Sequence, residues 1–164
     1  MTSKEQRPVR VLFVCLGNIC RSPTAEGVFK RYVREAGLER RIESDSAGTG
    51  DYHIGDPPDA RACAAAARRG YDLSALRGRQ VGKKDFSEFD YVLAMDDENM
   101  RALKRLCPRE NAHKLTLFTD FCSSGACSVP DPYGGGPQGF ELVLDLVEDA
   151  AQGLLRHIRT ELKN

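Results

Sequence analysis

The sequence predicts an α/β fold, a single three-layer domain in which a four-stranded parallel sheet carries helices on both faces. Apolar runs of strand length alternate along the chain with segments of helical periodicity, and this alternation is typical of right-handed β–α–β crossovers. The first run, VRVLFV at 9–14, lacks the polar alternation of a half-exposed strand and indicates burial on both faces. A length of 164 residues suits one core, so we expect one domain over 1–164, with residues 1–8 flexible.

Four strand-plus-helix pairs are expected in succession. Glycines 37 and 70 end the first two helices, where a left-handed cap belongs. Ser22 is expected at the N-cap of the first helix, with Pro23 in the first helical position. The expected strands are 9–14, 41–47, 91–95 and 114–118, and the expected helices are 23–36, 59–69, 98–106 and 138–162.

Composition excludes several classes of partner. Lys plus Arg and Asp plus Glu both total 24, so the formal net charge is zero, and nothing electrostatic favours nucleic acid or an anionic membrane. The polar start MTSKEQRPVR lacks the apolar core of a signal peptide, and no apolar run approaches the roughly 18 residues of a membrane span. Six cysteines are too sparse for a disulfide scaffold. We therefore expect a cytoplasmic protein.

The stretch CLGNICRSP at 15–23 joins the first strand to the first helix. Such a turn gathers backbone N–H groups and the positive end of the helix dipole around one concavity, which suits a tetrahedral oxyanion. Gly17 and Asn18 tolerate the backbone conformations that this nest requires, and Arg21 offers a planar fork for two phosphate oxygens. These groups would also favour the thiolate of Cys15. The loop therefore predicts a cysteine nucleophile that attacks a bound phosphoryl group, with Arg21 stabilising the transferring charge.

The spacing C-x5-R is weak by itself, because the chain contains a second copy from Cys63 to Arg69. That copy lies in an alanine-rich helical segment, where residues six apart are rotated by about 240° and cannot share a pocket. The prediction for Cys15 depends on the whole context of strand, glycine, Asn18, Arg21 and Ser-Pro.

Cleavage of a phosphate ester also requires a proton for the leaving oxygen. His53, His113 and His157 have no evident setting and are interpreted as surface or structural residues. Asp131 lies in PDPYGGG, between the fourth strand and the last helix, where prolines stiffen the backbone and glycines permit close approach. Asp-Pro is also a common turn, but the need for an acid favours Asp131 as the proton donor.

In the pattern formed by Cys15, Arg21, Ser22 and Asp131, the chain resembles the low-molecular-weight protein tyrosine phosphatases. CLGNICRSPTAE and DPYG match that family's two signatures, and SDSAGT, IGDPPDARA and FDYVLAMDDENM extend the likeness over essentially the whole chain. The resemblance implies a flavodoxin-like fold of the phosphotyrosine protein phosphatase I type. It also implies hydrolysis of phosphotyrosine, and of small aryl phosphates, through a phosphocysteine intermediate on Cys15, without metal or cofactor.

The resemblance assigns a role to each site residue. Arg21 would bind phosphate, and Asp131 would protonate the tyrosine leaving group and then activate water. Ser22 would donate to the cysteine sulfur, while Ser46 would hold Asn18 and so support the loop. Residues that would line the substrate and phosphate site are Leu16, Gly17, Asn18, Ile19, Cys20, Ser22, Tyr52 and Tyr133, with Tyr52 and Tyr133 as aromatic walls.

The resemblance also bears on substrate and partners. Ile19 favours phosphotyrosine, because related phosphoarginine phosphatases carry threonine at the matching position. The implied partners are phosphotyrosine proteins, such as a tyrosine kinase, with inorganic phosphate or another oxyanion in the site. The chain is expected to be a monomer or a weak homodimer. One departure is Gly134, where the family often has a second aromatic residue, so the resemblance does not define the cleft wall on that side.

The remaining cysteines have more than one possible interpretation. Cys20 could form a reversible disulfide with Cys15 or simply fill space in the core. Cys122 and Cys127 are interpreted as free thiols rather than a redox pair or zinc ligands. An arsenate reductase would need relay cysteines after the third strand, where only Cys107 occurs. A non-hydrolytic phosphocarrier would need no general acid, so Asp131 argues against it.

Overall fold

A computed structural model describes residues 7–163. The expectation that residues 1–8 are flexible therefore falls mostly outside the described residues. The sheet has four parallel strands in the order β2-β1-β3-β4, as the alternating pattern predicts. The strands are β1 (Val9–Cys15), β2 (Ile42–Gly48), β3 (Tyr91–Ala94) and β4 (Leu115–Leu117).

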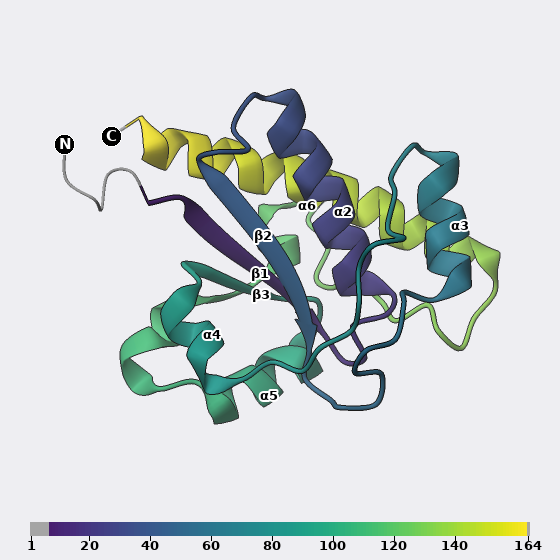
Figure 1. The fold of residues 1–164 in the computed structure, drawn as a ribbon, viewed down its shortest axis with the longest axis horizontal. Helices are drawn as coiled ribbons and strands as arrows, with labels where there is room; N and C mark the ends of the chain where they lie inside the picture. Colours follow the sequence, from purple (N-terminus) through teal and green to yellow (C-terminus); the bar gives the residue numbers. More distant parts are fainter. Residues whose placement is uncertain (1–6, 164) are drawn as a thin grey trace.

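Helices cover both faces of this sheet (Figure 1). One face carries α2 (Arg21–Glu35), α3 (Ala60–Arg68) and α6 (Pro137–Leu162), and the other carries α4 (Lys83–Glu88) and α5 (Asp97–Leu106). Two 3₁₀ turns, η1 (Arg109–Lys114) and η2 (Phe118–Phe121), flank β4. Within the described residues, no helix combines the length and apolar character needed to cross a bilayer.

The core consists of two apolar layers that share β1. Val11 and Phe13 point toward α2 and α6, whereas Leu12 and Val14 point toward α4 and α5, and all four are fully buried. This explains why the first strand shows no polar alternation: both of its faces are covered. Phe13 also contacts the rings of Phe29 and Phe118 edge-on, at 5.6 and 5.0 Å between centroids.

Two sequence expectations need correction. Ser22 is not an N-cap, because α2 already begins at Arg21 with Cys20 as its capping residue. The loop after β1 winds directly into the helix, so Ser22 is helical and its hydroxyl is used inside the site instead. The sequence analysis also missed α4, whose six residues are too few to show a periodic pattern. That helix is set by Asp85, which accepts a hydrogen bond from the Gly82 N–H at 2.8 Å.

Candidate active site

The segment Cys15–Ser22, here called the phosphate loop, lies at the carboxyl end of β1. The chain passes from β1 to β2 on one side and later to β3 on the other, so the strand order reverses at this point. Ligands bind at such a switch point in open α/β sheets. The sheet topology therefore places the loop predicted from sequence at the position where a ligand is expected.

Two neighbouring segments hold the outside of the phosphate loop. Backbone N–H groups of Thr49, Gly50 and Asp59 donate to the carbonyls of Cys15, Leu16 and Ile19 at 2.8, 3.0 and 2.8 Å. With its carbonyl groups bonded outward, the loop is left with N–H groups for the concave side, as an anion nest requires. Gly48 is needed for this packing, because a Cβ there would come within 2.7 Å of the Leu16 carbonyl oxygen.

The sulfur of Cys15 lies at the floor of the loop and is nearly buried, with 2% of the residue exposed. The Asn18 N–H donates to Sγ at 3.3 Å, and the Ser22 hydroxyl lies 3.0 Å from it. Because Ser22 Oγ accepts from the Asn18 side-chain amide at 2.8 Å, its own proton is free to point at the sulfur. Both contacts therefore donate toward Cys15 Sγ.

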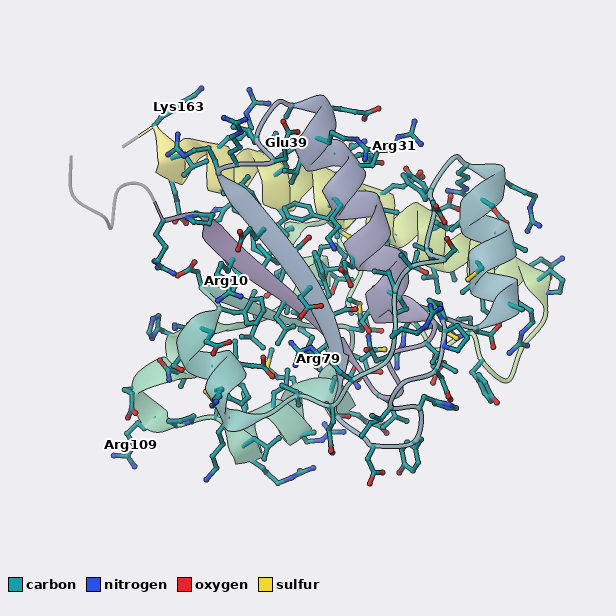
Figure 2. The ribbon with its side chains drawn as sticks, in the orientation of Figure 1. Arg10, Arg31, Glu39, Arg79, Arg109 and Lys163 are labelled. Carbon is teal, nitrogen blue, oxygen red and sulfur yellow. The ribbon has the colours of Figure 1, made fainter. Side chains whose placement is uncertain are left out.

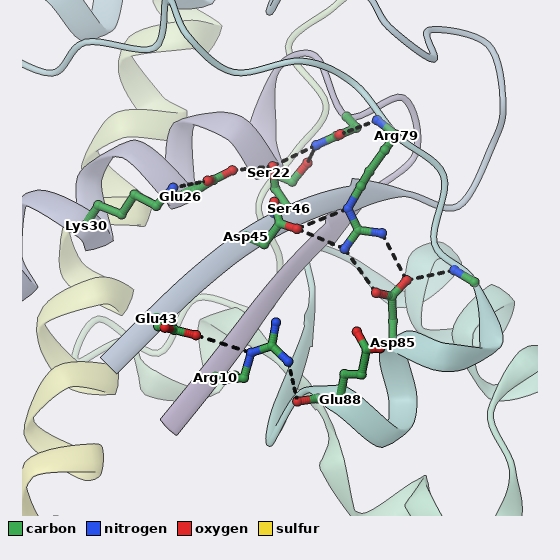
Figure 3. Close-up of polar contacts among 12 residues, drawn as sticks. Arg10, Ser22, Glu26, Lys30, Glu43, Asp45, Ser46, Arg79, Asp85 and Glu88 are labelled. Atoms are coloured by element: carbon green, nitrogen blue, oxygen red, sulfur yellow. Dashed lines mark hydrogen bonds and ion pairs between the residues drawn. The ribbon is translucent and has the colours of Figure 1, made fainter. Parts of the chain in front are cut away.

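Asn18 holds the loop shape. Its φ of 59° is the sole positive value at a non-glycine position in the described part of the chain, and asparagine tolerates that left-handed conformation better than most residues. Its amide donates to Ser46 Oγ at 3.0 Å, and its oxygen accepts from the Arg79 N–H at 3.0 Å. Ser46 in turn donates to the buried Glu26 at 2.7 Å (Figure 3). Ser46 therefore links Asn18 to Glu26.

Arg21 is the largest fully buried side chain among the described residues, with 2% exposed. Its Nη1 donates to Asp96 Oδ2 at 2.6 Å and to the Val129 carbonyl at 3.0 Å. Its Nη2 lies 3.7 Å from Asp131 Oδ2. A buried guanidinium with a carboxylate partner keeps a fixed orientation, which leaves the Nη2 side of the fork facing the cavity and Asp131.

Asp131 forms a turn and also faces the phosphate loop. One oxygen accepts from the Tyr133 N–H at 3.0 Å, which is an ordinary Asp turn. The other faces Arg21, and about half of the side chain is exposed. Asp131 and the phosphate loop therefore line one cavity, although they are more than a hundred residues apart in sequence.

The cavity has a volume of about 190 Å³. Tyr52 and Tyr133 line it and are largely exposed, at 70% and 53%. His53, which the sequence analysis set aside, also lines it and contacts Asp56 at 3.1 Å. Gly134 does not line this cavity, and a Cβ at that position would touch nothing within 4 Å. The lining residues are Cys15, Leu16, Gly17, Ile19, Cys20, Arg21, Tyr52, His53, Asp131 and Tyr133.

Cys20 is a buried residue of the phosphate loop. Burial, reinforced by the charge of Asp59, raises the pKa of its thiol to about 12, so the thiol stays protonated at neutral pH. Cys122 and Cys127 are free thiols, as predicted. Cys107 lines a separate cavity beside β4, not the one that holds Cys15, so it is not placed to act as a relay.

Three supporting residues escaped the sequence analysis: Asp96, Glu26 and Arg79. Asp96 lies two residues after the end of β3 and accepts from the Asn99 N–H at 2.8 Å, so its position near a strand's carboxyl end was a usable signal. Arg79 forms ion pairs with Asp45 and Asp85 at 3.1 and 3.0 Å. Figure 2 shows it beside the end of β2, whereas the labelled Arg109 and Lys163 project from the periphery.

Fold and site together define a class: α/β proteins with a cysteine-containing oxyanion loop after the first strand. Residues 10–164 match the family model described as low molecular weight phosphotyrosine protein phosphatase. The chain is 46% identical to the low molecular weight protein-tyrosine-phosphatase of Streptomyces coelicolor over 94% of this chain and 96% of that one.

Solved structures of protein tyrosine phosphatases are also similar to this chain. A protein tyrosine phosphatase of Entamoeba histolytica with Hepes in its active site superposes with a TM-score of 0.91 and 41% identity, covering 93% of this chain and 98% of that one. YfkJ from Bacillus subtilis gives a TM-score of 0.89 and 39% identity, covering 94% and 97%. The chain belongs to the low molecular weight phosphotyrosine protein phosphatase family. It is therefore a protein-tyrosine phosphatase, a hydrolase of phosphoric monoesters.

Proposed function

We propose that the protein cleaves phosphotyrosine in two steps, with Cys15 as nucleophile, Arg21 as phosphate ligand and Asp131 as general acid and base. The observation that carries the assignment is the position of Cys15 Sγ at the cavity floor, with two donors directed at it and Arg21 and Asp131 beside it. A thiolate placed among N–H groups next to a guanidinium has both a bound phosphate to attack and the charge stabilisation that phosphoryl transfer needs.

In the first step the Cys15 thiolate attacks phosphorus and the bond from phosphorus to the tyrosine oxygen breaks. The electron pair of that bond goes to the phenolic oxygen, which takes a proton from Asp131. In the second step the Asp131 carboxylate takes a proton from water while the water oxygen attacks phosphorus. The phosphorus–sulfur bond then breaks, inorganic phosphate leaves, and the Ser22 hydroxyl and Asn18 N–H stabilise the returning thiolate.

The shape of the cavity favours an aryl ester. Cys15 is almost fully buried at the floor, whereas Tyr52 and Tyr133 stand at the rim and Ile19 contributes an apolar wall. A long, flat phosphotyrosine side chain can reach the sulfur while its ring lies between the tyrosines, and aromatic pairs of this kind are favourable. We therefore infer phosphotyrosine rather than phosphoarginine as substrate. Phosphotyrosine proteins, including a tyrosine kinase, are the proposed partners, with a monomer or weak homodimer as the acting form.

The cytoplasm is the proposed compartment. Catalysis requires Cys15 as a reduced thiolate, and a reducing compartment maintains this form.

The decisive variant is Cys15→Ser, which should abolish turnover of a phosphotyrosine peptide and of p-nitrophenyl phosphate. Its matched control is Cys63→Ser, which removes the cysteine of the other C-x5-R segment, in α3 and outside the cavity, and should retain full activity. Rapid acid quench of the wild type with labelled substrate should trap phosphate on Cys15, identified by mass spectrometry. Wild-type turnover by Cys15→Ser would reject the mechanism.

A further inference from the structure

Arg61, the second residue of α3, connects two loops of the active site without lining the cavity. Its guanidinium donates to both carboxylate oxygens of Asp59, at 3.1 and 3.0 Å, and Nη2 also donates to the carbonyl of Tyr133 at 2.9 Å. It lies over the Tyr133 and Phe140 rings, 5.4 and 4.8 Å from their centroids. These contacts give one surface side chain three partner residues in three segments.

The Asp59 end of this arrangement reaches the phosphate loop. The Asp59 N–H donates to the Ile19 carbonyl at 2.8 Å, and its side chain caps α3 by accepting from the Arg61 N–H at 2.8 Å. The Asp59–Arg61 pair thus has one end on the loop that carries the nucleophile and the other on the loop that carries the acid.

The acid loop, defined here as Pro130–Gly136, has little other support. Its hydrogen bonds join Tyr133 to Asp131 and Gly135 to Pro132 within the loop. The Gly139 N–H of α6 donates to the Gly136 carbonyl at 3.1 Å, at the junction of the loop with the helix that follows it. Apart from that bond, in the described part of the chain, the bond from Arg61 is the one hydrogen bond that another segment makes to the loop. Three successive glycines follow Tyr133, and glycine gives an unrestrained loop many alternative conformations. Without Arg61, this loop would be held in place chiefly by the longer Arg21–Asp131 ion pair.

We propose that Arg61 is a positioning residue for the reaction: it fixes the Tyr133 carbonyl, and through the Asp131–Tyr133 turn it sets the carboxyl of Asp131 over the leaving oxygen. This inference rests on the proposed role of Asp131. A displacement of about 1 Å in a catalytic group can cost about 100-fold in rate, so releasing the loop should weaken acid catalysis while leaving Cys15, Arg21 and the phosphate nest intact.

Two substrates with different leaving groups distinguish a positioning role of Arg61 from a merely structural one. Phosphotyrosine releases a phenol with a pKa of about 10 and needs its proton, whereas p-nitrophenol is far more acidic and leaves with little help. For Arg61→Ala we expect kcat/KM to fall about 30-fold with a phosphotyrosine peptide and no more than about 3-fold with p-nitrophenyl phosphate. Arg61→Lys, which keeps a donor and a charge, should recover part of the loss.

The matched control is Arg68→Ala on the same helix, which loses an ion pair to Glu141 but no contact with the acid loop. Its kcat/KM should equal that of the wild type with both substrates. In an Asp131→Asn background, Arg61→Ala should cause almost no further loss, because the group that it positions is already gone. Thermal melting of each variant would verify folding.

Equal losses with both substrates, or a full additional loss in the Asp131→Asn background, would overturn the proposal. Failure of the proposed function itself would look different: Asp131→Asn would then show no leaving-group dependence while Arg61 variants behaved as Arg68→Ala does.

Discussion

Asp131 shows at the scale of one residue how a single side chain can both form a turn and face a cavity. Its Oδ1 closes the turn to Tyr133 and its Oδ2 faces Arg21. The same carboxyl is thus both held in place and presented to the cavity. In the sequence, Asp131 is typical of a common Asp-Pro turn. It is a candidate acid because it lies at the same cavity as Arg21 and Cys15.

Asp131→Ala should lower kcat for a phosphotyrosine peptide by about 10²–10⁴-fold, the usual contribution of general acid–base catalysis. KM should change little, because the proton is needed mainly in the transition state. Steady-state kinetics measure both constants. Asp120→Ala is the control, since Asp120 is an exposed carboxylate in η2 beside another cavity. A normal kcat for Asp131→Ala would remove this residue from the acid role.

At the scale of elements, the site depends on how closely its supporting segments approach. The contact between Gly153 in α6 and η2 is an example of such a close approach, although neither element lines the cavity. A Cβ there would lie 1.9 Å from the carbonyl oxygen of Phe121 in η2, so the backbones of the two elements are in contact. Helix propensity alone favours alanine over glycine by about 1 kcal/mol, yet this contact permits no side chain.

Gly153→Ala should therefore destabilise the protein, by about 1–3 kcal/mol, the usual cost of overpacking. Its counterpart is Gly139→Ala in the first turn of the same helix, where a Cβ would meet Pro132 at an ordinary 3.4 Å and stability should not fall. Urea denaturation of both variants gives the comparison. A Gly153→Ala variant as stable as the wild type would mean that α6 and η2 separate easily.

For the molecule as a whole, the two apolar layers stabilise a sheet whose loops carry the chemistry. The larger layer holds Leu154 of α6, which is fully buried and distant in sequence from every cavity residue. The loops around the cavity are more exposed than the core that supports them, and Tyr52, Ile54 and Tyr133 each have more than half of their surface exposed. Stability and catalysis should thus respond to different substitutions.

Leu154→Ala should reduce the free energy of unfolding by about 2–5 kcal/mol, because a buried leucine leaves a cavity when truncated. Its kcat/KM at 25 °C should equal that of the wild type while the protein remains folded. Leu142→Ala, at a half-exposed position on the same helix, should change stability by less than about 0.5 kcal/mol. Chemical denaturation and activity assays on the same samples would separate the two effects, and an active-site defect in Leu154→Ala would contradict this division.

The elements themselves were largely predictable. Every strand and four of the five α-helices were expected within one or two residues of their observed bounds, because long periodic segments and glycine caps are local signals. The start of α2 was wrong because the phosphate loop is itself wound like the beginning of a helix, and sequence cannot distinguish a cap from such a loop. Asp96, Glu26 and Arg79 escaped because each acts through a partner from another strand or loop.

The sequence by itself determined the strand–loop–helix unit that carries Cys15, Asn18, Arg21 and Ser22. These residues are contiguous, so the local backbone brings them around one concavity. Only the tertiary structure decided that Asp131 and Asp96 meet Arg21, and that Arg61 joins the acid loop to the phosphate loop. Such contacts depend on the strand order β2-β1-β3-β4, which gathers the carboxyl ends of β1 and β3, and the loops beyond them, at one edge of the sheet.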